Sequence, residues 1–186
     1  MRKLILSLHV SPDGFCNHDD VTPGTDWMHY VNDQMQHVGT VIFGRVTYQL
    51  FESFWPRLDP EKNWPEEMLR YSHLIDNVEK LVFSRTLQQA EWKNTSILPS
   101  LNLRVITELK EKEGKDIIVF GGPSIISELI RLHVFDEYYI AIQPMLSGGG
   151  QRLFTEMKRD RIPLDLVSMR TFEGGAVLLH YRNAEK

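Results

Sequence analysis

The sequence predicts an α/β fold of three layers, in which helices cover both faces of a central, mostly parallel mixed sheet. Short apolar runs of strand length alternate with longer segments whose apolar residues recur at helical spacing. The short runs are apolar at consecutive positions, which is typical of parallel strands buried on both faces. Two final strand-like segments, joined by Gly174 and Gly175, predict an antiparallel hairpin at the edge of the sheet.

The elements follow one another along the whole chain. The strand-like runs end in turn-forming residues and span residues 4–10, 40–43, 79–84, 95–99, 116–120 and 137–146, followed by the hairpin 164–183. The helix-like segments span residues 26–38, 46–54, 65–75, 101–114 and 123–133. In the first of them, Trp27, Val31 and Met35 lie on one apolar face. No repeat or linker interrupts this order, so the sequence predicts one domain over residues 1–186.

Composition excludes several classes of function. The net charge of −4 offers no basic surface for nucleic acid. Cys16 is the only cysteine, so an internal disulfide and a cysteine-based zinc site are excluded, as fits a reducing cytoplasm. No apolar run reaches the roughly 18 residues of a membrane span, and the first run is too short for a signal peptide. We expect a cytoplasmic protein without a metal site, a nucleic-acid partner or a membrane partner.

Four segments lie where strands of the predicted sheet end. They are residues 9–15, 44–48, 84–86 and 121–126. In open α/β sheets, ligands bind beyond the carboxyl ends of the strands. If the strands are parallel, all four segments lie at this edge. A further glycine run, residues 147–151, opens no helix, and we expect a mobile turn there.

Two of the four segments start a helix directly after glycine. A helix N-terminus carries about half a positive charge, and glycine lets a phosphate approach the backbone closely. Arg45 and Arg85 add cations, and hydroxyl donors come from Thr47, Ser84, Thr86 and Ser124. Several phosphate groups would suit this set, as in NADP, whose 2′-phosphate needs a cation of its own. Each segment alone also fits an ordinary turn, and neither G-x-G-x-x-G nor the P-loop pattern is present.

Five stretches in register carry a resemblance to a known family. They are SLHVSPDGF, VIFGRVTYQLF, KLVFSRTL, IIVFGGPSIISELI and VFDEYYIAIQPMLSGGGQRLF. They resemble the dihydrofolate reductase-like family, and within it the C-terminal reductase domain of the bifunctional riboflavin-biosynthesis deaminase–reductase and its stand-alone relatives. The resemblance covers about residues 2–182. It implies a dihydrofolate reductase-like fold, NADPH as the hydride donor and a homodimer, in which the YYIAI strand and the terminal hairpin are candidates for pairing.

The resemblance also assigns cofactor residues. Phosphates of NADPH would be held by Gly44, Arg45, Val46 and Thr47, the 2′-phosphate by Ser84 and Arg85, and the pyrophosphate by Gly121, Gly122, Pro123, Ser124 and Ile125. His9 would face the nicotinamide through its backbone, or be a core histidine. The peptide bond between Gly121 and Gly122 would be cis, which costs roughly 3 kcal/mol and is tolerated where function needs it.

Hydride transfer requires that the protein hold the nicotinamide and the acceptor close together, often beside a proton source. The resemblance implies a substrate-orienting carboxylate on the first helix, and Asp26 is the catalytic candidate. Its alternative role is that of a first-turn acid that stabilises the helix. The function implied is an NADPH-dependent reductase of a small pteridine- or pyrimidine-like heterocycle, resembling dihydrofolate reductase and 5-amino-6-(5-phosphoribosylamino)uracil reductase. The alternative is a non-catalytic NADP(H)-binding module, such as a redox sensor or an assembly partner.

Overall fold

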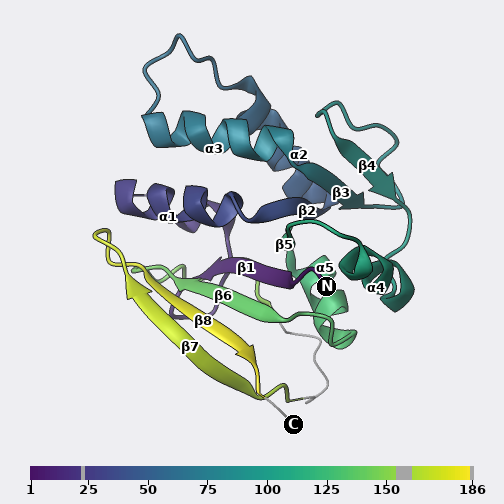
Figure 1. The fold of residues 1–186 in the computed structure, drawn as a ribbon. Coiled ribbons are helices and arrows are strands. Elements are labelled where there is room, and N and C mark those ends of the chain that lie inside the picture. Colours follow the sequence, from purple (N-terminus) through teal and green to yellow (C-terminus); the bar gives the residue numbers. More distant parts are fainter. Residues whose placement is uncertain (22–23, 154–160, 185–186) are drawn as a thin grey trace.

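A computed structural model describes residues 1–21, 24–153 and 161–184. One sheet of eight strands runs through them in the order β4-β3-β2-β5-β1-β6-β8-β7 (Figure 1). The strands are β1 (Leu4–Val10), β2 (Val38–Gly44), β3 (Glu79–Phe83), β4 (Thr95–Leu98), β5 (Asp116–Phe120), β6 (Glu137–Ile142), β7 (Leu164–Thr171) and β8 (Val177–Asn183). The first six are parallel, whereas β8 pairs antiparallel with β6 and β7 antiparallel with β8. The predicted fold class, with its terminal hairpin, is confirmed.

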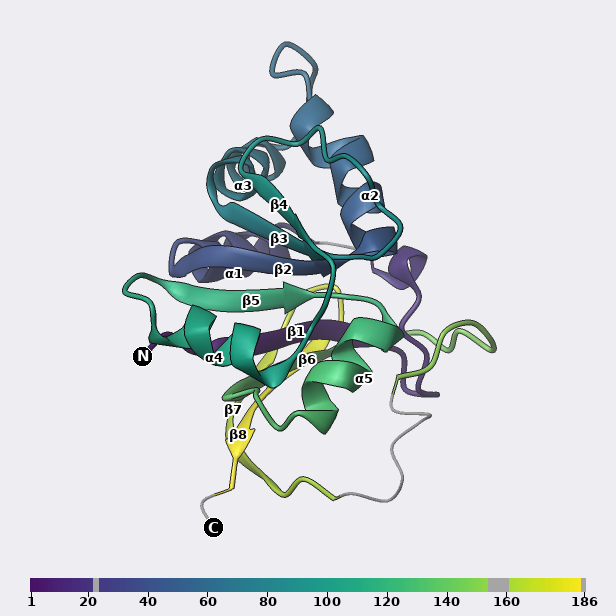
Figure 2. The ribbon, with the colours of Figure 1, turned by 90° about the vertical axis from the view of Figure 1, so that its right-hand side faces the viewer.

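Helices cover both faces of the sheet (Figures 1 and 2). They are α1 (Thr25–Met35), α2 (Arg45–Phe54), α3 (Glu66–Asn77), α4 (Leu103–Glu111) and α5 (Pro123–Arg131), with short 3-10 turns η1 (His18–Asp20) and η2 (Trp55–Arg57). The first three helices pack on one face, and α4 and α5 pack on the other. Strand β5 shows why the strands are apolar at consecutive positions. Its Ile118 packs toward α1 and α3, its Ile117 and Val119 pack toward α4 and α5, and all three are fully buried.

The structure differs from the prediction at the end of the first helix. The helical spacing of apolar residues continues to Val38, but α1 ends at Met35. Val38 instead begins β2, where it pairs with Asp116. A single buried valine fits the apolar stripe of a helix and the start of a strand equally well, and pairing with β5 decides between them.

Strand β6 lies inside the sheet, because it pairs with β1 on one side and β8 on the other. Its edges are therefore not free, and the prediction that YYIAI pairs across a dimer is wrong. The outer strand of the hairpin, β7, is the one at the edge of the sheet. Within the described ranges, no helix has the length and apolar character needed to span a bilayer.

Candidate functional site

The four predicted ligand segments lie at one edge of the sheet. They follow β1, β2, β3 and β5, which are mutually parallel neighbours. Their carboxyl ends therefore point the same way, as Figure 2 shows for the starts of α2 and α5 beside β2 and β5. We call this the carboxyl edge.

The starts of α2 and α5 lie side by side at the carboxyl edge. Each helix has a glycine as N-cap, Gly44 and Gly122, and neither has a side-chain capping hydrogen bond. A Cβ atom placed on Gly44 would lie 3.4 Å from Ile125 Cγ2, and one on Gly122 would lie 3.9 Å from Thr47 Oγ1. In α4, by contrast, the side chain of Asn102 accepts a hydrogen bond from the first turn. The first-turn N–H groups of α2 and α5 thus have no side-chain acceptor and can bind one anion together.

The predicted residues around these helix starts differ in what they offer. Arg45, Val46 and Ser124 are exposed, and Val46 keeps 65% of its surface accessible. Pro123 takes the first helical position, where its missing N–H costs nothing. Ile125 is buried, so its side chain is not available to a ligand.

The glycines at the carboxyl edge are needed for different reasons. A Cβ atom on Gly121 would come closer than 3.0 Å to Ile125 Cγ2, a separation that real Cβ atoms essentially never show. Gly44 (φ −82°, ψ 160°) and Gly122 (φ −74°, ψ 174°) have extended backbones that any residue adopts. A Cβ atom at either would make only ordinary contacts. The packing of the chain therefore requires glycine at 121, whereas at 44 and 122 it does not.

The peptide bond between Gly121 and Gly122 is trans, so the prediction of a cis bond is wrong. The extended backbone of Gly122 is sufficient to lead the chain from β5 into α5. The close contact with Ile125 accounts for the first glycine of the pair without a cis bond.

The segment after β3 forms a tight turn. The Ser84 hydroxyl oxygen accepts hydrogen bonds from the backbone N–H groups of Thr86 (3.2 Å) and Leu87 (3.0 Å). Arg85 and Thr86 are exposed on this turn. Because β3 is the neighbour of β2, the turn lies on the side of Gly44 that faces away from β5. It can hold a phosphate separate from the one at the helix starts.

His9 lies near the carboxyl end of β1, on the face that carries Ile5 and α1. Burial lowers the pKa of its imidazole below the ordinary value of 6.5, and the nearby His18 lowers this pKa further. The side chain is therefore neutral at pH 7. Both roles expected for His9, a backbone contact with the nicotinamide or a core histidine, are compatible with this position.

Asp26 lies in the first turn of α1 and joins it to the terminal hairpin. One carboxylate oxygen accepts a hydrogen bond from the backbone N–H of Trp27 (2.8 Å), and the other accepts from the N–H of Glu173 (2.8 Å). Beside it, the ring of Trp27 packs edge-on against Phe172 at 4.9 Å. The carboxylate therefore has a structural role in this state of the molecule. A catalytic role for Asp26 stays a prediction.

The glycine run after β6, for which we expected a mobile turn, is bound to the loop after β1. Asp13 accepts hydrogen bonds from the N–H groups of Ser147 (3.2 Å) and Gly148 (2.8 Å). Asn17 donates to Gly149 O (2.9 Å). Hydrogen bonds from the Ser11 hydroxyl and then the Gly148 amide lower the pKa of Asp13 to about 2. The two loops thus form one unit at the carboxyl edge, which no local sequence pattern indicates.

An aromatic row, Phe120–Phe51–Trp55, starts at the carboxyl edge and was not predicted from the sequence. Phe120 precedes Gly121 and stacks on Phe51, with ring centroids 5.7 Å apart and planes inclined by 21°. Phe51 is in turn 6.3 Å from Trp55. All three rings are partly exposed. Phe51 lies near the end of α2 and Trp55 begins η2, and their spacing of four residues is the only signal in the sequence that could have found this row.

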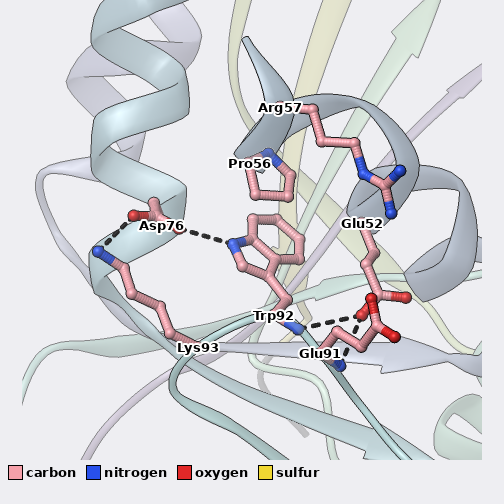
Figure 3. Close-up of a pocket in the computed structure, with 7 residues that line it drawn as sticks. All are labelled: Glu52, Pro56, Arg57, Asp76, Glu91, Trp92 and Lys93. Atoms are coloured by element: carbon pink, nitrogen blue, oxygen red, sulfur yellow. Dashed lines mark hydrogen bonds and ion pairs between the residues drawn. The ribbon is translucent and has the colours of Figure 1, made fainter. Parts of the chain in front are cut away.

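Two cavities contain none of the predicted site residues. Figure 3 shows the smaller, of about 230 Å³, which is lined by Glu52, Pro56, Arg57, Asp76, Glu91, Trp92 and Lys93. Its polar groups bind one another: Trp92 Nε1 donates to Asp76 at 2.8 Å, and Glu52 accepts from the N–H groups of Glu91 and Trp92. The other cavity, of about 450 Å³, lies at the opposite edge of the sheet, beside the end of α1. Neither cavity belongs to the carboxyl edge.

The chain is similar to known proteins along almost its whole length. The family model described as "RibD C-terminal domain" matches residues 2–178. The chain is 33% identical to "Uncharacterized protein YyaP" of Bacillus subtilis (strain 168), over 97% of this chain and 94% of that protein.

Solved structures share the fold at low sequence identity. A putative riboflavin biosynthesis protein from Shewanella sp. PV-4 superposes with a TM-score of 0.69 at 18% identity, over 100% of both chains. Dihydrofolate reductase from Enterococcus faecalis, complexed with NADP(H) and RAB-propyl, superposes with a TM-score of 0.63 at 16% identity, over 98% of this chain and 97% of that one. The fold and the family match agree, and the chain belongs to the RibD C-terminal domain family, with a dihydrofolate reductase-like fold.

Proposed function

We propose that this protein is an NADPH-dependent reductase of a small pteridine- or pyrimidine-like heterocycle. The observation that carries the proposal is the pair of uncapped helix starts, α2 and α5, in contact at the carboxyl edge. Exposed Arg45 and Arg85 flank them. Two N-termini suit a pyrophosphate, and a guanidinium on a separate turn suits the 2′-phosphate that distinguishes NADPH from NADH. The Enterococcus faecalis structure with the same fold is described with NADP(H), which supports this choice.

The glycines give the proposal its steric basis. Neither the backbone nor the packing requires glycine at Gly44 or Gly122. A ligand that lies against the backbone does require it, because a Cβ atom would occupy the space of a phosphate oxygen. In this assignment the N–H groups after both glycines bind the pyrophosphate, the Thr47 hydroxyl donates to it, and Arg85 binds the 2′-phosphate. When bound, NADPH supplies the hydride.

The aromatic row supports a planar acceptor. Phe120 lies one residue before the Gly121–Gly122 turn, so the row leads away from the proposed phosphate site along α2. Partly exposed aromatic faces bind planar heterocycles by stacking. The chain's contribution to the reaction is to hold the acceptor flat and close to the nicotinamide, which is the main requirement of hydride transfer.

One observation favours the alternative of a non-catalytic NADP(H)-binding module. Both carboxylate oxygens of Asp26 already accept backbone hydrogen bonds. A carboxylate has about four lone-pair sites, so Asp26 can still accept from a substrate. It has, however, a sufficient structural reason to be present. The two functions share the cofactor site and differ at Asp26.

Binding of the cofactor is tested first, by titrating NADPH and NADH in parallel with tryptophan fluorescence as the readout. We expect NADPH to bind at least tenfold more tightly than NADH, a difference of about 1.4 kcal/mol. If neither dinucleotide binds, both candidate functions are excluded. If NADPH binds, oxidation of NADPH is measured with a series of pteridines and pyrimidines as acceptors. Turnover of one of them supports the reductase, and no turnover with any supports the binding module.

Asp26→Asn then separates a catalytic from a structural role once an acceptor is known. A catalytic carboxylate predicts that kcat/KM falls and that its pH profile changes, while NADPH binding is retained. A structural carboxylate predicts a lower melting temperature with kcat/KM unchanged. Thr25→Ser, a neighbouring exposed change in the same helical turn, is the matched control.

A further inference from the structure

The turn of the terminal hairpin lies beside the start of α1 (Figure 1). Strand β8 runs antiparallel to β6, so its first residue, Val177, pairs with Ile142, the last residue of β6. The turn between β7 and β8 is therefore at the carboxyl edge, as the candidate cofactor site is. A Cβ atom on Gly175 would lie 3.3 Å from Pro144 Cβ, so the turn also packs closely on the segment after β6.

Aromatic contacts hold this turn against α1. Phe172, where the turn begins, is buried, and its ring packs edge-on against Trp27 at 4.9 Å and Tyr30 at 5.7 Å. Arg170 lies over the rings of Phe172 (4.9 Å) and Tyr30 (5.4 Å). These apolar and cation–π contacts join the hairpin to the helix without any hydrogen bond from Asp26.

The backbone of the turn leaves the N–H group of Glu173 available to another segment. The N–H of Gly175 donates to Phe172 O (2.8 Å), so Glu173 and Gly174 are the central residues of a β-turn. Neither of them is among the described residues with positive φ, as expected for a type I turn. In such a turn the N–H of the first central residue has no acceptor within the turn. Here that N–H donates to Asp26 at 2.8 Å.

This hydrogen bond fixes the orientation of the Asp26 carboxylate. The N–H of Trp27 holds one oxygen and the N–H of Glu173 holds the other, both at 2.8 Å. Rotation of the carboxylate about its Cβ–Cγ bond would break these bonds, which are roughly twice as strong as bonds between neutral groups. About two of the four lone-pair sites remain, and the side chain is partly exposed. The result is a rigid acceptor at the carboxyl edge.

We propose that the hairpin turn is part of the candidate active site, and that the backbone N–H of Glu173 positions the Asp26 carboxylate to accept a hydrogen bond from the heterocycle. This inference rests on the proposed function. Groups that contact a substrate act best when neighbouring hydrogen bonds hold them within about 0.5 Å of the productive geometry. The hairpin supplies such a bond from its backbone, and the side chain of Glu173 is exposed. Glu173 is thus a positioning residue, and Asp26 is the residue that contacts the acceptor.

Two substitutions at position 173 separate the backbone donor from the side chain. Glu173→Pro removes the N–H group and is compatible with the turn, because the first central position of a type I turn favours the φ of proline, about −65°. Glu173→Ala removes the same side chain and keeps the N–H group. A comparison of the two variants therefore measures what the hydrogen bond to Asp26 contributes.

The test is steady-state turnover with NADPH and an acceptor that the wild type reduces. We expect kcat/KM for the acceptor to be at least about tenfold lower in Glu173→Pro than in Glu173→Ala, while both variants bind NADPH with the wild-type Kd. In an Asp26→Asn background the same two substitutions should differ by less than about twofold, because the charged carboxylate is no longer there to be positioned.

A purely structural hydrogen bond predicts a different result. Glu173→Pro would then have a lower melting temperature than Glu173→Ala, or would fail to fold, and any folded protein would have the same kcat/KM in both variants. Either outcome overturns the inference, as does a tenfold difference that persists in the Asp26→Asn background. A wild type that binds no NADPH or reduces no acceptor rejects the proposed function, and the inference with it. Turnover by the wild type with equal kcat/KM in the two variants rejects the inference alone.

Discussion

The two adjacent glycines at the start of α5 should respond to alanine in opposite ways. Gly121 is constrained by packing, because its Cβ would come within 3.0 Å of Ile125 Cγ2. Gly122 has an ordinary backbone conformation, and a Cβ atom there would make only an ordinary contact with Thr47 Oγ1, at 3.9 Å. We expect Gly121→Ala to destabilise the fold, and Gly122→Ala to leave the fold intact while weakening NADPH binding.

The magnitudes follow from the kind of contact. Overpacking a buried site costs about 1–3 kcal/mol. Ile125 is β-branched and buried, so it can move little, and we expect Gly121→Ala to cost about 2 kcal/mol. For a chain of this length, that lowers the melting temperature by roughly 4–8 °C. Gly122→Ala removes backbone freedom from the unfolded chain and should change stability by less than about 1 kcal/mol, in the stabilising direction.

The assay is thermal unfolding of both variants with and without saturating NADPH, combined with a fluorescence titration of the cofactor. We expect Gly122→Ala to raise the Kd for NADPH at least tenfold, which is about 1.4 kcal/mol. Its unfolding without cofactor should match that of the wild type. The reasoning is refuted if Gly122→Ala binds NADPH as the wild type does, or if it loses as much stability as Gly121→Ala.

Three further predictions concern single side chains. Arg85→Ala should raise the Kd for NADPH at least tenfold and leave that for NADH unchanged, measured by titration, with Arg104→Ala, an exposed arginine on α4, as the control. Lys80 is fully buried and donates to three carbonyls at the end of α3, so Lys80→Met should lower the melting temperature by roughly 4–8 °C without changing NADPH binding. The folded-state pKa of His9 lies below its unfolded value of 6.5, so unfolding experiments should show stability falling as the pH drops through 6.5. The stability of His9→Gln should fall less steeply as the pH drops, and equal slopes for the variant and the wild type would contradict the prediction.

Local patterns in the sequence were sufficient for most of the fold. Strands such as β5 are apolar at consecutive positions, here Ile117 to Phe120, because helices cover both faces, and this makes them recognisable without a structure. The pattern gave a wrong prediction at Val38, because one buried valine fits both the end of a helix and the start of a strand. Its long-range pairing with Asp116 places it in β2. Helix starts after glycine were likewise visible, since they depend only on neighbours in the chain.

The parts of the candidate site that could not be predicted depend on contacts between distant segments. The glycine run after β6 is held by Asp13 and Asn17, more than 130 positions earlier, and its own composition suggested mobility. We expected a cis bond at Gly121 because of the family resemblance, but the bond is trans. The structure requires this glycine because a Cβ atom there would come too close to Ile125, one turn along α5. The hydrogen bond from Glu173 to Asp26 similarly joins two ends of the chain.

The place of β1 in the sheet has a consequence for synthesis on the ribosome. It is the first strand to be made, yet both of its neighbours, β5 and β6, begin only at Asp116 and Glu137. At ordinary elongation rates, roughly 5–20 s pass before the first partner has been translated. During that interval Leu4, Ile5 and Leu6 have no partner strand, although all are buried in the finished protein. The sheet can therefore be completed only after the second half of the nascent chain has emerged.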